Sequence, residues 1–71
     1  MGTILRLIMK ATIFLIYEDD SEVCFEFSCD APENEAHAAL LWVCRGTLMA
    51  SMAIRAVAYN EEGFYICSYV R

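Results

Sequence analysis

Apolar side chains recur at every second position along the first part of the chain, and this period of two is the strongest constraint on its fold. Such alternation predicts a β-strand with one buried face. The opposite face of the same segment includes Arg6, Lys10 and Thr12. The apolar face, taken from residues 3–17, consists of Leu5, Leu7, Met9, Ala11, Ile13, Leu15 and Tyr17.

A straight strand of this length is too long for a small domain. Residues 3–17 would span roughly 50 Å when extended, whereas a chain of 71 residues has a radius of gyration of about 11 Å when folded. Two interpretations remain open. Either the first residues form a separate arm or exchange onto a neighbouring chain, or the strand begins near Met9 and residues 1–8 are an extension.

Further strands are predicted on both sides of a central helical segment. Glu18–Ser21 is a polar break that indicates a hairpin turn, and a second alternating strand follows over Glu22–Cys29. Two more strands are expected over residues 53–59 and 64–70. The segment between them ends in Gly63, which suits the left-handed position of a hairpin turn.

Signals for the start of a helix follow the second strand. Asp30 is a good N-cap residue, Pro32 suits the first turn, and Glu33 completes a capping box. We expect the helix over residues 36–51, with Gly46 weakening its middle. The helix is apolar nearly all round, which is typical of a helix covered on two sides. Its predicted inward stripe is Ala36, Ala39, Leu40, Val43, Thr47 and Ala50. Outside that stripe lie Leu41, Trp42, Leu48, Met49 and Met52.

Two hairpins joined by one helix predict an α+β fold of the order ββαββ, in a single domain over residues 1–71. We expect a four-stranded antiparallel sheet with the helix packed across one face. The other face of the sheet is expected to stay open. Depending on register, it carries either the alternate positions of the last two strands or the set Arg55, Val57, Tyr59, Tyr65, Cys67 and Tyr69.

The chain is more apolar than a domain of its size can bury. Hydrophobic residues make up 59%, against about 45–50% in ordinary domains, and a small domain hides only about 60% of the surface that its unfolded chain exposes. We therefore expect a homodimer or a protein-binding module. The net charge of -5 opposes direct binding to nucleic acid. The apolar start, interrupted by Arg6 and Lys10, fits neither a membrane span nor a secretion signal, so a cytoplasmic location with reduced thiols is expected.

No catalytic or cofactor motif stands out. The candidate thiol or metal ligands, Cys24, Cys29, Cys44, Cys67 and His37, do not have the spacing of a zinc site. His37 and Cys44 share a helix face about 10 Å apart, which is too far for a hydrogen bond between a nucleophile and its base. We expect no cofactor, no metal and no enzymatic activity, so a thiol- or metal-dependent site is the least favoured hypothesis.

Acidic residues are concentrated in one segment, because eight of the ten fall between Glu18 and Glu35. The ββαββ path divides them between the first turn and the start of the helix, where the second hairpin is expected to bring two more. The predicted acidic cluster is Asp30, Glu33, Glu35, Glu61 and Glu62. Such a cluster would steer the chain to a basic groove or imitate nucleic-acid phosphates. The alternative is that charges at turns and caps serve only solubility.

Aromatic and methionine side chains are the second set of candidate binding residues, because interface cores are rich in them. Tyr59, Tyr65 and Tyr69 are expected on the open sheet face, and Trp42 and Met49 on the outer helix face. The leading hypothesis is a small non-enzymatic protein that docks on a larger protein with a basic patch and inhibits or modulates it, in the style of inhibitors encoded by phages. The alternative is a self-assembling structural subunit.

Overall fold

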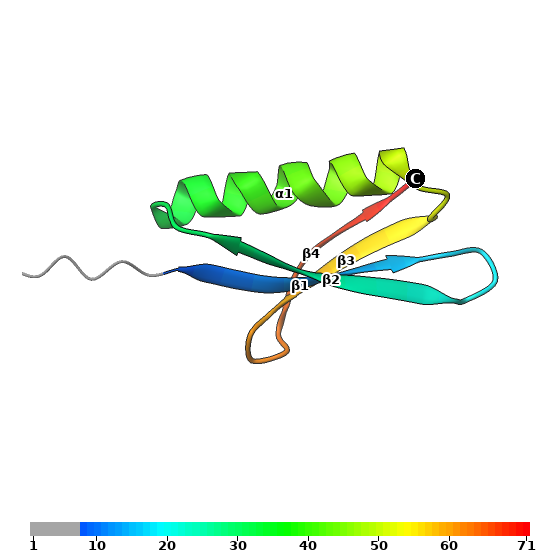
Figure 1. Cartoon of the computed structure of the whole chain (residues 1–71), viewed down its shortest axis with the longest axis horizontal. Coiled ribbons are helices and arrows are strands. Elements are labelled where there is room, and N and C mark those ends of the chain that lie inside the picture. Colours follow the sequence, from blue (N-terminus) through cyan, green and yellow to red (C-terminus); the bar gives the residue numbers. More distant parts are fainter. Residues whose placement is uncertain (1–7) are drawn as a thin grey trace, which may run out of the picture.

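The computed structural model describes residues 8–71 and folds them into one sheet and one helix (Figure 1). The elements, in chain order, are β1 (Met9–Ile16), β2 (Glu22–Cys29), α1 (Glu33–Ala50), β3 (Arg55–Asn60) and β4 (Tyr65–Val70). All neighbouring strands are antiparallel, in the order β2-β1-β3-β4. Figure 1 shows α1 lying along one side of the twisted sheet. The predicted α+β fold of four antiparallel strands and one helix is confirmed.

The first strand begins at Met9, at the position where the second interpretation of the alternating segment placed it. The prediction of an extension or arm concerns residues 1–8; residues 1–7 lie outside the described residues, and Ile8 is exposed just before β1. Strands β2, β3 and β4 begin or end within two residues of the predicted bounds. The period of two therefore located the strands well.

The start of α1 differs from the prediction. The N-cap residue is Pro32, not Asp30, and no side chain caps this end of the helix. Instead, the Pro32 carbonyl oxygen accepts the first helical hydrogen bond, from the backbone N–H of Ala36 at 2.9 Å. The capping box predicted from Asp30 and Glu33 is wrong, because the helix begins two residues later than that motif requires.

The core forms where α1 crosses β1 and β3. Ile13 and Leu40 are fully buried, and small side chains on the two central strands let the helix approach the sheet closely. The core cluster consists of Ala11, Ile13, Leu15, Leu40, Cys44, Leu48, Ala53, Ala56 and Ala58.

The helix stripe that reaches the core is rotated from the predicted one. Its buried residues are Ala36, Leu40, Cys44 and Leu48, which follow one another at intervals of four positions. The prediction included Ala50, which is exposed, and left out Leu48, which is buried. An i, i+4 ridge is a common way for a helix to meet its neighbour. Since the helix is apolar on several sides, hydrophobicity alone did not distinguish this ridge from the adjacent one.

A bulge in the second hairpin decides which side chains of β4 reach each face. Tyr65 pairs with Tyr59 and Cys67 pairs with Ala58, so Ile66 is an extra residue on β4. Tyr65 therefore lies on the open face, whereas Cys67 and Tyr69 pack against the core on the helix side. The expectation that Cys67 and Tyr69 share the open face with Tyr65 is wrong, because a bulge shifts the alternation by one position.

Both hairpin turns are held by side chains of their own residues. The Asp19 carboxylate accepts hydrogen bonds from the backbone N–H and the hydroxyl of Ser21, and these bonds lower the pKa of Asp19. In the second turn, the Asn60 side-chain oxygen accepts from the N–H groups of Glu62 and Phe64, both at 2.9 Å. Gly63 adopts the predicted left-handed conformation, with φ 86°. The turn that carries Glu61 is therefore well defined.

Candidate functional site on the open face of the sheet

The face of the sheet that points away from α1 is here called the open sheet face. Side chains that pair across neighbouring strands stand side by side on it, so its composition follows from the strand register. Its members are Lys10, Thr12, Phe14 and Ile16 on β1; Glu22, Cys24, Glu26 and Ser28 on β2; Arg55, Val57 and Tyr59 on β3; and Tyr65, Ser68 and Val70 on β4. Phe14 and Val57 pair in the middle of this face, and its charged residues are Glu22 and Glu26 on β2, Lys10 on β1 and Arg55 on β3.

Three aromatic rings form a continuous contact across this face. The rings of Phe14 and Tyr59 meet edge to face with centroids 5.7 Å apart. Tyr59 meets Tyr65 in the same manner at 6.4 Å. The Tyr65 hydroxyl forms a hydrogen bond of 2.9 Å with that of Ser68, yet Tyr65 is 62% exposed. The open sheet face thus carries a fixed aromatic ridge that solvent reaches.

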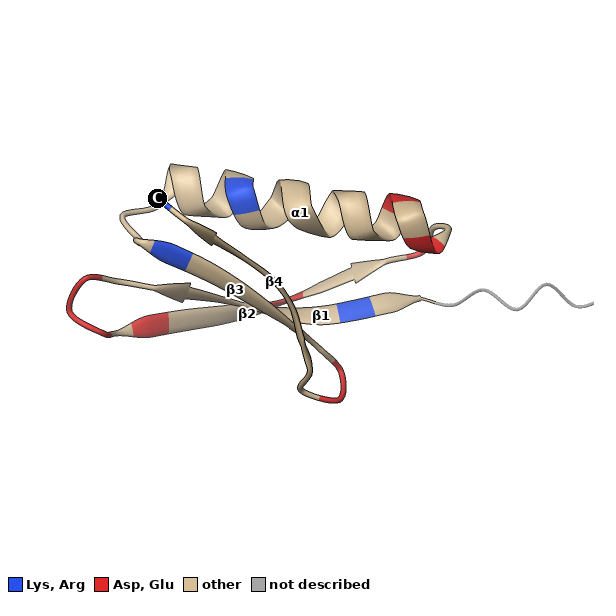
Figure 2. Ribbon diagram, turned by 180° about the vertical axis from the view of Figure 1, so that it is seen from behind, with Lys and Arg blue, Asp and Glu red and all other residues tan. Residues whose placement is uncertain are grey.

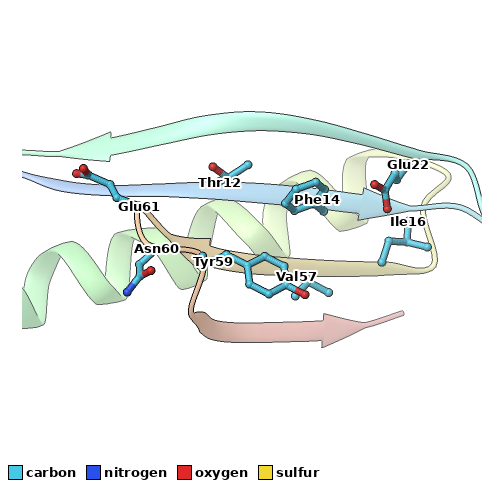
Figure 3. A pocket seen from close by; sticks show the side chains of 9 residues that line it. Thr12, Phe14, Ile16, Glu22, Val57, Tyr59, Asn60 and Glu61 are labelled. Carbon is cyan, nitrogen blue, oxygen red and sulfur yellow. The ribbon is translucent and has the colours of Figure 1, made fainter.

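A groove of about 520 Å³ runs beside this ridge. It is lined by Thr12, Phe14, Ile16, Val57 and Tyr59, among others. Figure 3 shows the side chains of Glu22 and Glu61 at opposite ends of the groove, with the aromatic side chains between them. Thr12 and Ile16, which line the groove along β1, are four residues apart, a rise of about 13 Å along the strand.

A second hollow, of about 580 Å³, adjoins the groove and is more polar. It shares Thr12 and Glu61 with the groove and is lined further by Lys10, Glu26 and Ser28. Glu61 therefore stands at the junction of an apolar and a polar depression on the same face. An apolar surface bordered by charged side chains is typical of a binding surface for another macromolecule.

The predicted acidic cluster is divided between two regions. Figure 2 shows the acidic residues at the start of α1 apart from those of the turn between β3 and β4, with the ribbon of β1 between them in this view. The turn bends away from the helix, so Glu61 belongs to the open sheet face instead. Glu33 and Glu35 remain exposed in the first turn of α1. The role of these acidic residues in partner binding stays a prediction.

The outer side of α1 is apolar, as expected. Trp42 is 74% exposed and Met49 61% exposed. Met52, just beyond the end of the helix, is also exposed. These residues lie on the opposite side of the molecule from the open sheet face, since α1 covers the other face of the sheet.

The cysteines do not converge. Cys24 is exposed on the open sheet face, whereas Cys29 pairs with Met9 and lies on the helix side of the sheet. Only Cys44 and Cys67 meet, across the interface of α1 and β4, and all four thiols are free. Burial, with a smaller contribution from the neighbouring Cys67, raises the pKa of Cys44 to about 12, and burial also raises that of Cys67.

The contacting thiols of Cys44 and Cys67 differ from those of reactive cysteines in the direction of their pKa shift. Reactive cysteines have a lowered pKa, and the pKa values of Cys44 and Cys67 move in the opposite direction. His37 is exposed on α1, away from the buried thiol of Cys44. Within residues 8–71, no group of three or more His, Cys, Asp or Glu side chains is arranged to hold a metal ion.

The sequence prediction did not single out Phe14 and Ile16, which line the groove. A signal was present, because both are apolar although they alternate with the buried face of β1. A strand whose side chains are apolar on both faces is normally covered by other elements or by a partner on both. Tyr59, Tyr65, Glu61 and this pair now define the candidate site, while Tyr69 belongs to the core.

In the part of the chain that the structure describes, no helix combines the length and the hydrophobicity needed to cross a membrane. Comparisons of the chain with protein-family models, with curated proteins and with solved structures give no match.

Proposed function

We propose that this chain is a non-enzymatic protein-binding module that docks through its open sheet face on a basic, partly apolar segment of a larger protein and modulates or inhibits it. The observation that carries this proposal is the groove between Glu22 and Glu61, which Phe14 and Tyr59 help to line. It is a solvent-accessible surface that combines apolar area with charge of one sign at both ends.

The aromatic ridge supplies affinity. Phe14 and Tyr59 hold each other in place, so a partner that covers them buries apolar area without first ordering these rings, and the entropic cost of binding is small. Tyr65 adds an exposed ring with a polar hydroxyl, a combination that is enriched at the energetic centres of protein interfaces.

The carboxylates orient the bound partner and raise its rate of association. Glu22 and Glu61 at opposite ends of the groove favour a segment with two Lys or Arg residues and apolar side chains between them. The net charge of -5 gives the whole molecule the sign that attracts such a basic partner over longer distances. The free thiols fit a reducing compartment such as the cytoplasm.

The proposal is tested by capture of partners from a lysate of the source organism, followed by affinity measurements with the purified partner. The informative variants are Tyr65→Glu, on the ridge, and the pair Glu22→Gln with Glu61→Gln, at the ends of the groove. The matched control is the pair Glu33→Gln with Glu35→Gln, which changes the net charge by the same amount at the start of α1.

We expect the groove pair to weaken binding by about fivefold or more at low salt, which corresponds to about 1 kcal/mol. Affinity of the wild type should fall as salt concentration rises, because salt screens the carboxylates. The helix-start pair should bind like the wild type. A partner that tolerates Tyr65→Glu, or that responds only to the helix-start pair, would contradict the assignment of the open sheet face.

A further inference from the structure

A second surface, the outer face of α1, has a pattern that the proposed function does not use. Glu35, Ala38, Trp42, Arg45 and Met49 follow one another at alternating intervals of three and four positions, and all are exposed. This spacing places them in one line along the helix, opposite the buried ridge. The outer face of a helix that contacts only its own sheet is normally charged. Here two large apolar side chains, Trp42 and Met49, and the small Ala38 stand exposed between the charged Glu35 and Arg45.

Gly46 lies beside this line, and no contact within residues 8–71 explains it. A glycine in the interior of a helix costs about 1 kcal/mol relative to alanine. Gly46 is exposed, and a Cβ atom added to it would meet nothing within 4 Å. Packing within residues 8–71 therefore does not require a residue without a side chain at this position. Small residues on a helix surface allow the backbone of another helix to come close.

The line is complementary to itself when two copies of the helix run antiparallel. Setting Trp42 of one chain beside Arg45 of the partner subunit also sets Ala38 beside Met49 of the partner subunit, by the twofold symmetry of the pair. The first pairing is a cation over an aromatic ring, which is attractive. The second pairs a small side chain with a large one, so both contacts fit in the same interface.

Charge also favours the antiparallel arrangement. It places the acidic first turn of each helix, with Glu33 and Glu35, beside the last turn of the other. At that last turn the guanidinium group of Arg71 lies against the carbonyl oxygens of Leu48 and Ser51. Arg71 adds positive charge near that end of the helix, and the two helix dipoles are opposed. A parallel pair would instead set Arg45 beside Arg45 of the partner subunit.

We propose that two copies of this chain associate through the outer faces of α1, as an antiparallel helix pair. The inference does not depend on the proposed function, because it uses the opposite side of the molecule. Both open sheet faces stay free in such a dimer and point away from each other. A single helix pair buries less area than the about 1,200 Å² of a standard stable interface, so the dimer should dissociate in the micromolar range.

The test is sedimentation equilibrium of the wild type and of single variants over micromolar to millimolar concentrations. Met49→Glu and Gly46→Gln should each weaken dimerisation by about tenfold or more, since one buries a charge and the other fills the site of close approach. Gly46→Gln is expected to stabilise the monomer, because glutamine has the higher helix propensity. Loss of the dimer in that variant therefore would not result from unfolding. His37→Glu on the flank of α1 and Tyr65→Glu on the open sheet face are the controls and should dimerise normally.

Orientation is tested by cross-linking in a Cys24→Ser background, which removes the exposed thiol. A mixture of the variants Ala38→Cys and Met49→Cys should form a mixed disulfide with oxidised glutathione, and neither variant should cross-link with itself. A wild type that stays monomeric at millimolar concentration overturns the proposal. So does a dimer that Tyr65→Glu disrupts and Met49→Glu leaves intact, or efficient cross-linking of Ala38→Cys with itself.

Discussion

The guanidinium group of Arg71 donates a hydrogen bond to the carbonyl oxygen of Leu48, in the last turn of α1. It also donates to the carbonyl of Ser51 and, through Nε, to that of Ala53 at 2.9 Å. A positive charge stabilises the carbonyl end of a helix. The last turn of α1 contains no basic residue, so this charge is supplied by Arg71, directly after β4. This contact ties the helix to the last strand.

Replacement of Arg71 should destabilise the fold. We expect Arg71→Met to lower the free energy of unfolding by about 1–2 kcal/mol, the lower part of the range for hydrogen bonds to charged groups, because Arg71 is exposed. Urea denaturation followed by circular dichroism measures this change. Arg55→Met, at an exposed position of β3, should change stability by less than about 0.5 kcal/mol. Equal effects of the two substitutions would show that the carbonyl contacts contribute nothing.

Stability should fall at alkaline pH because of Cys44. In the folded chain its pKa is raised from 9.0 to about 12 by burial, so the unfolded chain loses this proton at lower pH than the folded chain. Above about pH 9 the folded state binds more protons, and the free energy of unfolding decreases by up to about 1.4 kcal/mol per pH unit for one group. The effect is absent below that pH.

Urea denaturation of the wild type and of Cys44→Ala between pH 8 and pH 10.5 isolates this effect, since the tyrosines are common to both proteins. The alkaline decrease should be shallower in Cys44→Ala. Cys24→Ala removes an exposed thiol and should retain the slope of the wild type. An identical slope in all three proteins would refute the role of the buried thiol.

The contact of Phe14 with Tyr59 should be measurable as a coupling energy. Edge-to-face aromatic pairs contribute about 0.5–1.5 kcal/mol beyond the burial of their area, and these rings meet at 5.7 Å. A double-mutant cycle with Phe14→Leu and Tyr59→Leu should return a coupling in that range. A cycle with Phe14→Leu and the more distant Val70→Ala, on the outer strand of the same face, should be additive within about 0.5 kcal/mol.

The two described glycines should respond oppositely to alanine. Gly63 has φ 86°, a conformation that costs an L-residue about 1 kcal/mol or more, so Gly63→Ala should destabilise. Gly46 is helical with open space around it, so Gly46→Ala should stabilise the monomer by up to about 1 kcal/mol. Thermal denaturation at low micromolar concentration, where the monomer predominates, measures both. A loss of stability in Gly46→Ala would contradict the open surroundings of that position.

Most of the fold followed from local pattern. The alternation of Val23, Phe25 and Phe27 identified β2, and Gly63 identified the second turn, because these signals are carried by neighbouring residues. The role of Arg71 did not follow, since its partners in α1 lie about twenty positions earlier in the chain and no local motif links them. The helix cap at Asp30 failed for a related reason. The spacing of Asp30 and Glu33 is a local signal, and tertiary context overrides such signals.

The candidate site was predicted only in part. Composition and position indicate Tyr59, Tyr65 and Glu61. They do not single out Phe14 and Ile16, because the alternation in β1 is dominated by the buried side chains next to them. Tyr69 was placed on the wrong face, because a bulge is set by strand pairing and leaves no fixed mark in the sequence. The acidic residues of the second turn were separated from the helix start by sheet twist, which a flat topology diagram omits.

The extra residue Ile66 has a consequence for how this fold could vary. It lets β4 place Ile66, Cys67 and Tyr69 against the core while Tyr65 still reaches the groove side. Deletion of Ile66 would restore a regular ladder without moving Tyr65 from that side, at the cost of one packed aliphatic side chain. A distant relative with the same aromatic ridge is therefore expected to align with a gap of one residue at this point. The aromatic side chains on the open sheet face, rather than the length of the last hairpin, are then the feature by which to align such chains.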